Sequence, residues 1–301
     1  MSDAPDTGLD TGLDTATVNA TLNSPQHRAG LNDLTLTVTA VTRRYPWLAR
    51  VTGTVEGMAA TDPETWRHPN LAVRLAIPDP EDALGPMIGQ PGVCRRVYTL
   101  AAVDYATSTV DIDIVIHGDT SPMMRWVAGL TPGDRVDFAG PRPHAAPVDT
   151  AVDTASRIHL LADGSAYPAA SAIARSIPGV ASVILAVPEE NPQVGTYAAD
   201  FPGAQLQFVT ASATPLADAL PDLPVAPGDT VWAAGEREDI RAVRTFCLKD
   251  LGLPKSHLQV FGYWRTGKTG TDADVARLGA IARLQAEGRQ LTAEDDFDVD
   301  I

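Results

Sequence analysis

Residues 96–99 place three functional side chains within four positions: the guanidinium of Arg96, the ring of Tyr98 and the hydroxyl of Thr99. On an extended backbone such groups can lie over one flat, polar ligand. A guanidinium pairs with a diphosphate, an aromatic ring stacks on a planar group and a hydroxyl forms a hydrogen bond. Flavin adenine dinucleotide (FAD) is a ligand of that kind. We therefore predict that Arg96, Tyr98 and Thr99, together with Val97 between them, contact FAD.

A second segment, residues 117–126, contains the start of a helix. Thr120 or Ser121 is expected at its N-cap, and Pro122 suits the first helical position. Backbone N–H groups at the start of a helix bind phosphate readily. We therefore expect His117, Thr120 and Ser121 to complete the FAD site.

These two segments need a scaffold, and the first half of the chain predicts an antiparallel β-barrel. From Leu34 onward, short apolar-polar alternations are separated by turn residues. Residues 110–116, for example, alternate apolar side chains with Asp111 and Asp113, which is typical of a strand with one solvent-exposed face. Such strands in succession predict a barrel over residues 31–145, interrupted by one helix.

The second half of the chain changes to strands that alternate with helices. Apolar runs at 158–162 and 180–187 enclose a helical stretch, and a strand at 230–234 leads into a helix over about 237–251. This order predicts a parallel sheet whose ligands lie at the carboxyl ends of its strands. The expected fold class is therefore a β-barrel domain followed by a smaller α/β domain over residues 155–270.

Both ends of the chain are acidic. Residues 1–26 and 294–301 carry nine of the fifteen net negative charges. We predict a disordered acidic tail over 1–30, and an amphipathic helix with an acidic tail over 271–301. Such an acidic chain is a poor partner for nucleic acid.

Location and metal content can also be predicted. No window approaches 18 uninterrupted apolar residues and the N-terminus has no signal-like pattern, so no membrane partner is expected. The two cysteines, Cys94 and Cys247, lie far apart, and the six histidines show no metal-ligand spacing. These features predict a cytoplasmic protein with free thiols and no metal site of its own.

The segment from Gly262 to Thr269 matches the phosphate-binding pattern Gly-x-x-x-x-Gly-Lys-Thr. Taken alone, that pattern indicates a nucleotide triphosphatase. Only 32 residues follow Thr269, however, which is too few for the remaining strands of such a fold. Tyr263 and Trp264 also crowd a backbone that would have to wrap a phosphate. We therefore favour another role for this segment.

Seven short motifs, taken in order, resemble the siderophore-interacting proteins, which are ferric-siderophore reductases of the ferredoxin reductase superfamily. The resemblance covers roughly residues 31–270 and is far more specific than any single motif. It implies an FAD-dependent oxidoreductase that reduces Fe(III) in a siderophore to Fe(II), with NAD(P)H or a ferredoxin as electron donor. The motifs lie at residues 96–99, 117–118, 132–134, 140–142, 161–168, 231–236 and 262–265.

The resemblance also implies roles for individual residues. It implies an electron-donor site at Asp163, Ser165 and Glu236 in an NAD(P)H-reductase-like second domain, and it adds Trp264 to the FAD site. Where the family commonly has Asp-Glu-Thr-Ala-x-Pro, this chain has Asp-Gly-Ser-Ala-Tyr-Pro, so the identity of the donor stays open. Glu236 has an alternative role as a carboxylate at the start of a helix. For an anionic ferric siderophore, the family uses basic residues near the flavin. Their counterparts here are Arg74, Arg142, Arg265 and Lys268.

Two other functions remain open on the sequence. One is a general flavin reductase of the same superfamily, which would tolerate loss of the basic residues. The other is a flavin-containing siderophore-binding protein without turnover. In every case the iron is expected to arrive inside the substrate.

Overall fold

The structure is a computed structural model, and the chain divides into two compact units. The larger unit is formed by Gly30–Pro78 and Arg95–Thr266, and the smaller by Met1–Ala29, Asp79–Cys94 and Gly267–Ile301. Of the predicted site residues, Lys268 alone belongs to the smaller unit. The expected tail over 1–30 and Thr120 lie outside the described residues, as does most of 271–301. The structure describes residues 31–79, 92–118, 121–147, 156–209, 212–268, 272, 276, 279, 280, 283, 284 and 287.

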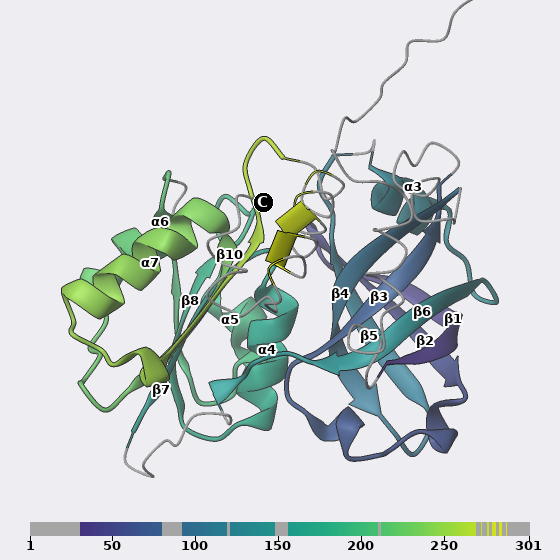
Figure 1. The fold of residues 1–301 in the computed structure, drawn as a ribbon, viewed down its shortest axis with the longest axis horizontal. Coiled ribbons are helices and arrows are strands. Elements are labelled where there is room, and N and C mark those ends of the chain that lie inside the picture. The colour runs from purple at the N-terminus through teal and green to yellow at the C-terminus, as the bar shows by residue number, and fades with distance from the viewer. Residues whose placement is uncertain are drawn as a thin grey trace, which may run out of the picture. The chain divides into compact units, whose positions relative to one another are not determined.

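The first half of the chain forms a closed antiparallel barrel of six strands in the order β1-β2-β5-β4-β3-β6 (Figure 1). Leu36, Val51, Leu75 and Ile112 point inward and are almost fully buried. Closing the sheet on itself leaves no unpaired edge. The strands are β1 (Asn32–Tyr45), β2 (Leu48–Glu56), β3 (Leu71–Pro78), β4 (Val93–Asp104), β5 (Thr109–Val115) and β6 (Arg135–Pro143).

Among the described residues, three helical segments accompany the barrel. Two are short 3-10 turns, η1 (Met58–Ala60) and η2 (Thr65–Arg67), and the third is α3 (Pro122–Gly129). The helix predicted after Thr120 is therefore confirmed. One detail of the barrel prediction is wrong: Asp113, expected on a solvent-exposed face of β5, is 2% exposed because Arg44 and Arg50 cover it.

The second half of the chain forms a five-stranded sheet in the order β11-β10-β7-β8-β9, and every strand pair in it is parallel. Strands β7 and β10, in the middle, are buried almost throughout, as expected for a parallel sheet covered on both faces. The predicted fold class is confirmed. The strands are β7 (Ile158–Asp163), β8 (Val180–Ala186), β9 (Gln205–Phe208), β10 (Thr230–Glu236) and β11 (Leu258–Trp264).

Helices cover both faces of this sheet, with α4 and α7 on opposite sides (Figure 1). The chain leaves β7 toward β8 but leaves β10 toward β11 in the other direction, so right-handed connections place their helices on opposite faces. The helices are α4 (Tyr167–Ser176), α5 (Val194–Tyr197), α6 (Pro215–Asp218) and α7 (Arg237–Lys249), with 3-10 turns η5 (Ala198–Asp200), η6 (Leu220–Asp222) and η7 (Lys255–His257). None of the helices in the described part of the chain is long and apolar enough to cross a membrane.

The two halves of the larger unit share one hydrophobic core. Tyr45, Trp47 and Leu48 from the turn between β1 and β2 belong to the same buried cluster as the side chains of α4 and β7. The ring centroids of Tyr45 and Tyr197 lie 4.4 Å apart, and those of Trp47 and Tyr167 lie 5.3 Å apart. The barrel therefore contributes aromatic side chains to the core of the α/β half.

Candidate functional site

Strand β4 carries the predicted flavin motif. Side chains alternate along a strand, so Arg96 and Tyr98 share one face of β4, whereas Val97 and Thr99 share the other. Arg96 and Tyr98 are half-buried, and Val97 is 55% exposed. The structure therefore brings the guanidinium and the ring together, and only the backbone of Thr99 can serve a ligand on that face.

The second predicted segment lies beside the first. Strands β4 and β5 run antiparallel with Leu100 opposite Ile112, so the first half of β4 lies next to the end of β5, which leads to the exposed His117. Gly118 follows with φ +59°, and a Cβ added there would meet no heavy atom within 4 Å. The segment after β5 thus leaves open space beside its backbone.

Helix α3 begins as predicted. Ser121 is its N-cap, and the hydroxyl oxygen accepts a hydrogen bond from the backbone N–H of Met124 at 3.3 Å. Pro122 occupies the first turn, where its missing N–H costs nothing. Thr120 lies outside the described residues. The start of α3 therefore follows His117 within a few residues of the chain, as the sequence predicted.

The carboxyl edge of the parallel sheet brings together three other predicted residues. One oxygen of Asp163 accepts hydrogen bonds from the backbone N–H and the hydroxyl of Ser165 and from the N–H of Ala166. Its other oxygen accepts a hydrogen bond from the indole N–H of Trp264 at 2.6 Å. Burial raises the pKa of Asp163, although these donors act against the shift. Asp163, Ser165 and Trp264 thus form one hydrogen-bonded group.

Gly235 allows this group to form. Its φ is +155°, and a Cβ there would lie 2.7 Å from the carboxyl carbon of Asp163. Strands β7 and β10 are neighbours, and the chain leaves them in opposite directions, so the gap between their carboxyl ends is the topological switch point of the sheet. Ligands of open α/β sheets bind at such a point. Here the side chain of Asp163 lies across it.

Glu236 performs the alternative role that the sequence offered. One of its carboxylate oxygens accepts the N–H groups of Glu238 and Asp239 and caps α7. The other accepts the N–H of Thr266 at 3.0 Å. Burial works against ionisation, yet these backbone hydrogen bonds lower the pKa of Glu236. Both oxygens are used within the chain, and a donor-binding role for Glu236 stays a prediction.

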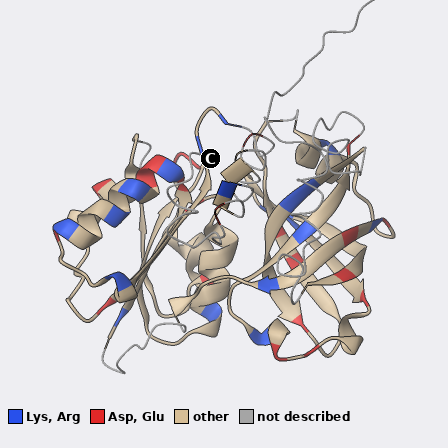
Figure 2. Cartoon of the chain, in the orientation of Figure 1, with Lys and Arg blue, Asp and Glu red and all other residues tan. Residues whose placement is uncertain are grey.

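The four predicted basic residues fall into separate places. Arg74 and Arg142 lie on the paired barrel strands β3 and β6, with Arg142 opposite Ala72. Arg265 follows β11 and lies 3.8 Å from a carboxylate oxygen of Glu238. Lys268 is exposed. Figure 2 shows Lys and Arg both on the barrel strands and along α7. The substrate role of these four residues stays a prediction.

The first three residues of the phosphate-loop pattern lie in a strand and not in a loop. Strand β11 runs through Gly262, Tyr263 and Trp264, and Gly262 pairs with Gly235 of β10. A backbone paired in a sheet cannot wrap a phosphate, which agrees with our rejection of the triphosphatase alternative. Thr269 lies outside the described residues.

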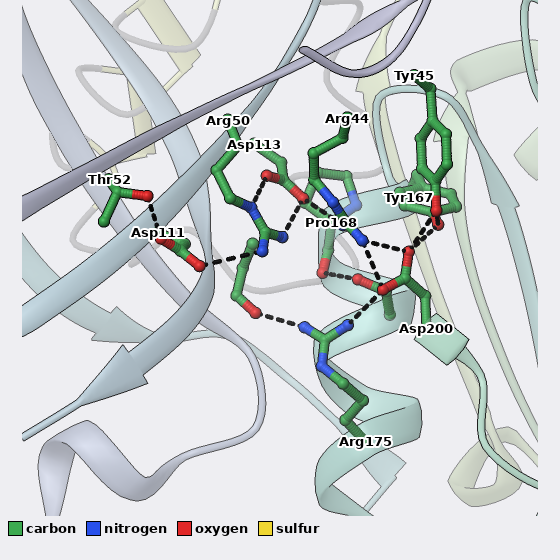
Figure 3. Close-up of polar contacts among 12 residues, drawn as sticks. Arg44, Tyr45, Arg50, Thr52, Asp111, Asp113, Tyr167, Pro168, Arg175 and Asp200 are labelled. Atoms are coloured by element: carbon green, nitrogen blue, oxygen red, sulfur yellow. Dashed lines mark hydrogen bonds and ion pairs between the residues drawn. The ribbon is translucent and has the colours of Figure 1, made fainter. Parts of the chain in front are cut away.

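Sequence reasoning missed a cluster of buried and partly buried polar side chains where the barrel meets α4 (Figure 3). Its members come from distant positions of the chain, and the one sequence signal was Tyr167 in the motif at 161–168. The residues are Arg44, Tyr45, Arg50, Asp111, Asp113, Tyr167, Arg175 and Asp200.

A closed antiparallel barrel followed by a parallel sheet is the fold of the ferredoxin reductase-like flavoproteins. The solved structure of a cytochrome P450 reductase from Amycolatopsis matches with a TM-score of 0.57 over 79% of this chain and 71% of that one. The identity is 22%, so this likeness shows the fold alone.

Two protein-family models match the sequence of this chain. The chain belongs to the siderophore-interacting protein family: the siderophore-interacting FAD-binding domain matches residues 37–145, and the siderophore-interacting protein domain matches residues 155–267. FAD is therefore the cofactor of the barrel, as predicted.

Two relatives extend the match along the chain. Ferric acinetobactin reductase of Acinetobacter baumannii is 28% identical over 278 residues, which cover 91% of this chain and 92% of the relative. The solved siderophore-interacting protein of the same organism has a TM-score of 0.70 at 27% identity, over 85% of this chain and 98% of that one.

Proposed function

We propose that this protein is an FAD-dependent ferric-siderophore reductase. The observation that carries the proposal is the match to ferric acinetobactin reductase along nine-tenths of both chains. The product, Fe(II), is held weakly by a siderophore and so is released from it. Cytoplasmic location is part of the proposal, and the two buried cysteines, Cys94 and Cys247, are free thiols as that compartment requires.

The residues around β4 and α3 suit FAD. Arg96 can balance the charge of a diphosphate, and Tyr98 on the same face can cover a planar ring. The capped start of α3 and the open space at Gly118 suit a second contact to phosphate. Bound FAD supplies a carrier that links a two-electron donor to a one-electron acceptor.

Exposed apolar side chains support this assignment. Among the described residues, three large apolar side chains are exposed, and two of them, Val97 and Trp264, belong to the predicted FAD site. Exposed apolar groups near a polar rim commonly mark binding sites. We therefore retain Trp264 as an FAD contact. The side chain of Val97 lies on the other face of β4 from Arg96 and Tyr98, so its predicted contact with FAD is one through the backbone.

An anionic ferric siderophore needs local positive charge on this acidic chain. Arg74 and Arg142, on neighbouring barrel strands, are the pair that we assign to it first. Arg265 already lies near Glu238, and that carboxylate offsets part of its charge. Arg265 and Lys268 are therefore secondary candidates.

The electron donor is NAD(P)H or a ferredoxin, with a slight preference for NAD(P)H. Its proposed site is the loop at 163–166 beside the switch point, with Asp163 and Ser165 as contacts and Glu236 next to them. The two alternatives, a general flavin reductase and a siderophore-binding flavoprotein without turnover, predict different half-reactions.

The test follows both half-reactions without oxygen. The FAD-loaded protein is mixed with NADH, NADPH or reduced ferredoxin, and bleaching of the flavin absorption is followed. The reduced protein is then mixed with a ferric catecholate, with a ferrous chelator present to trap the product. We expect bleaching by at least one donor and rapid reoxidation by the chelate. Reoxidation by quinones but not by ferric chelates would favour the general reductase. No bleaching by any donor, together with no reoxidation of the dithionite-reduced protein by the ferric catecholate, would favour the binding protein.

A further inference from the structure

Asp200, in the last position of η5, gathers donors from both halves of the larger unit (Figure 3). One nitrogen of Arg44 donates to both carboxylate oxygens at 2.8 and 2.9 Å. The hydroxyl groups of Tyr45 and Tyr167 donate to the same oxygen, and Arg175 donates to the other at 3.4 Å. Asp200 is 6% exposed, so these four side chains replace the water that it lost.

The donors around Asp200 favour an ionised carboxylate. Each phenol has one proton, and burial raises the pKa of both Tyr45 and Tyr167, so both phenols stay protonated and donate. Burial of Asp200 opposes its ionisation, but the hydrogen bonds from Arg44 and the two phenols lower its pKa. A neutral side chain at this position could not accept all of these donors equally well.

The charges of the cluster alternate. Arg44 also donates to Asp113 at 3.2 Å, and Arg50 donates to both oxygens of Asp113 at 2.6 and 2.8 Å. Two buried carboxylates, Asp113 and Asp200, are thus each paired with arginine. The cluster ties β1, β2 and β5 of the barrel to η5 of the α/β half.

Helix α4 is held at both ends by this cluster. Tyr167 is its first residue and donates to Asp200, while Arg175, near its last turn, donates to Asp200 and to the backbone oxygen of Ala101. Ala101 lies on β4, two residues after Thr99. The helix that follows the proposed donor loop is therefore fixed to the strand that carries the FAD motif.

Trp47 makes a second connection between these two places. A Cβ added to Gly164 would lie 3.6 Å from the Trp47 ring, so this ring packs against the donor loop. The backbone oxygen of Trp47 accepts the N–H of Ile116, the residue before His117, at 2.7 Å. One turn of the barrel thus touches both the donor loop and the segment predicted to bind FAD.

We propose that Asp200 is a positioning residue for electron transfer from the donor: through Tyr167 and Arg44 it holds the loop at 163–166 at a fixed place relative to Arg96 and Tyr98. The proposal rests on the donor site assigned above. Loosening the loop should lower the limiting rate of flavin reduction more than it weakens FAD binding, because a misplaced electron donor transfers electrons slowly even when it is bound.

Two tyrosines give a matched test. Tyr45→Phe and Tyr167→Phe each remove one hydroxyl that donates to the same oxygen of Asp200, but only Tyr167 continues the donor loop. For Tyr167→Phe we expect the limiting rate of flavin reduction by NADH, NADPH or reduced ferredoxin to fall about fivefold or more, and for Tyr45→Phe less than about twofold. FAD content and reoxidation of the dithionite-reduced protein by a ferric catecholate should stay unchanged in both variants.

A third variant and a second measurement complete the design. Asp200→Asn should slow the same step at least as much as Tyr167→Phe, and amide hydrogen exchange of residues 163–168 should rise in both but not in Tyr45→Phe. If Asp200→Asn fails to fold, the tyrosine pair decides alone. Equal effects of the two tyrosine changes, or an effect on reoxidation, would overturn the positioning role. If no donor reduces the wild-type protein while the dithionite-reduced form still reduces the ferric catecholate, the donor site and the positioning role are both wrong, and the ferric reductase stands.

Discussion

The indole nitrogen of Trp264 lies 2.6 Å from a carboxylate oxygen of Asp163, so the end of β11 is joined to the end of β7 across the strand between them. That middle strand, β10, passes beneath the contact with Gly235. The absence of a side chain at Gly235 is what allows the carboxylate to reach the indole.

Gly235→Ala should be strongly destabilising. The new Cβ would lie 2.7 Å from the carboxyl carbon of Asp163, at a φ of +155° that side chains rarely adopt. We expect the free energy of unfolding in urea to fall by about 2 kcal/mol or more. Gly252→Ala is the control, because Gly252 has φ +66° but open space around it, and should cost about 1 kcal/mol. Equal losses in the two variants would show that Asp163 moves aside freely.

Arg96→Gln should weaken the binding of FAD. Loss of a charge-assisted contact to the diphosphate should raise the dissociation constant about 10- to 100-fold, measured by flavin fluorescence during titration of the apoprotein. Arg95→Gln is a matched control, because Arg95 is the neighbouring half-buried arginine on the opposite face of β4. Similar weakening in both variants would contradict the assignment of the Arg96 face to the cofactor.

Arg74→Gln and Arg142→Gln should impair reduction of anionic chelates only. At low salt we expect the KM for a ferric catecholate to rise about 3- to 10-fold in each variant, and the difference to shrink at high salt because ions screen it. A neutral ferric hydroxamate serves as the control substrate, and Arg43→Gln, an exposed arginine on β1, serves as the control variant. A rise of the same size with the neutral chelate would exclude an electrostatic role.

Stability should fall below neutral pH through His159. This histidine is 1% exposed between Ser182 and Asp229, with ring nitrogens 2.7 and 3.0 Å from their oxygens. Burial lowers the pKa of His159 in the folded chain, although Asp229 acts against the shift. Below an ordinary pKa of 6.5 the unfolded chain therefore binds a proton that the folded chain resists, and stability is lost as the pH falls from there toward the lower folded value.

Urea unfolding at several pH values checks this expectation, and His159→Gln should reduce the slope between pH 7 and pH 5. Asp229 contributes in a separate window. Burial opposes its charge, but hydrogen bonds from Ala226, His159 and Arg157 lower the pKa of Asp229 to about 2, so its contribution is lost only as the pH falls below 3.8. An unchanged slope in His159→Gln would contradict the histidine assignment.

The barrel was predictable from local alternation of apolar and polar residues, and the parallel sheet from apolar runs that alternate with helices. Ser121 as an N-cap was confirmed because Ser before Pro is a local helix-start signal, and the strand ending at Asp163 was confirmed because its apolar run is continuous. The predicted exposure of Asp113 was wrong. Alternation places Asp113 on the outer face of β5 but cannot reveal that Arg44 and Arg50 cover that face.

The contacts of Asp200 were beyond sequence reasoning. Its partners come from β1 and α4, up to 156 positions away, and no local spacing relates them. Glu236 was an intermediate case. The sequence offered two roles for its carboxylate: the cap of α7 is local and was confirmed, the donor-binding role stays a prediction, and the contact of its second oxygen with Thr266, thirty positions away, had no local signal.

The aromatic turn between β1 and β2 limits how the gene can be divided. A fragment that ends before β7 would expose Tyr45, Trp47 and Leu48 to water and leave Arg44 without Asp200. A fragment that begins at β7 would lack the rings that pack on Tyr167 and Tyr197. Neither piece would be a self-sufficient module, so recombination between relatives should succeed only when both halves are exchanged together.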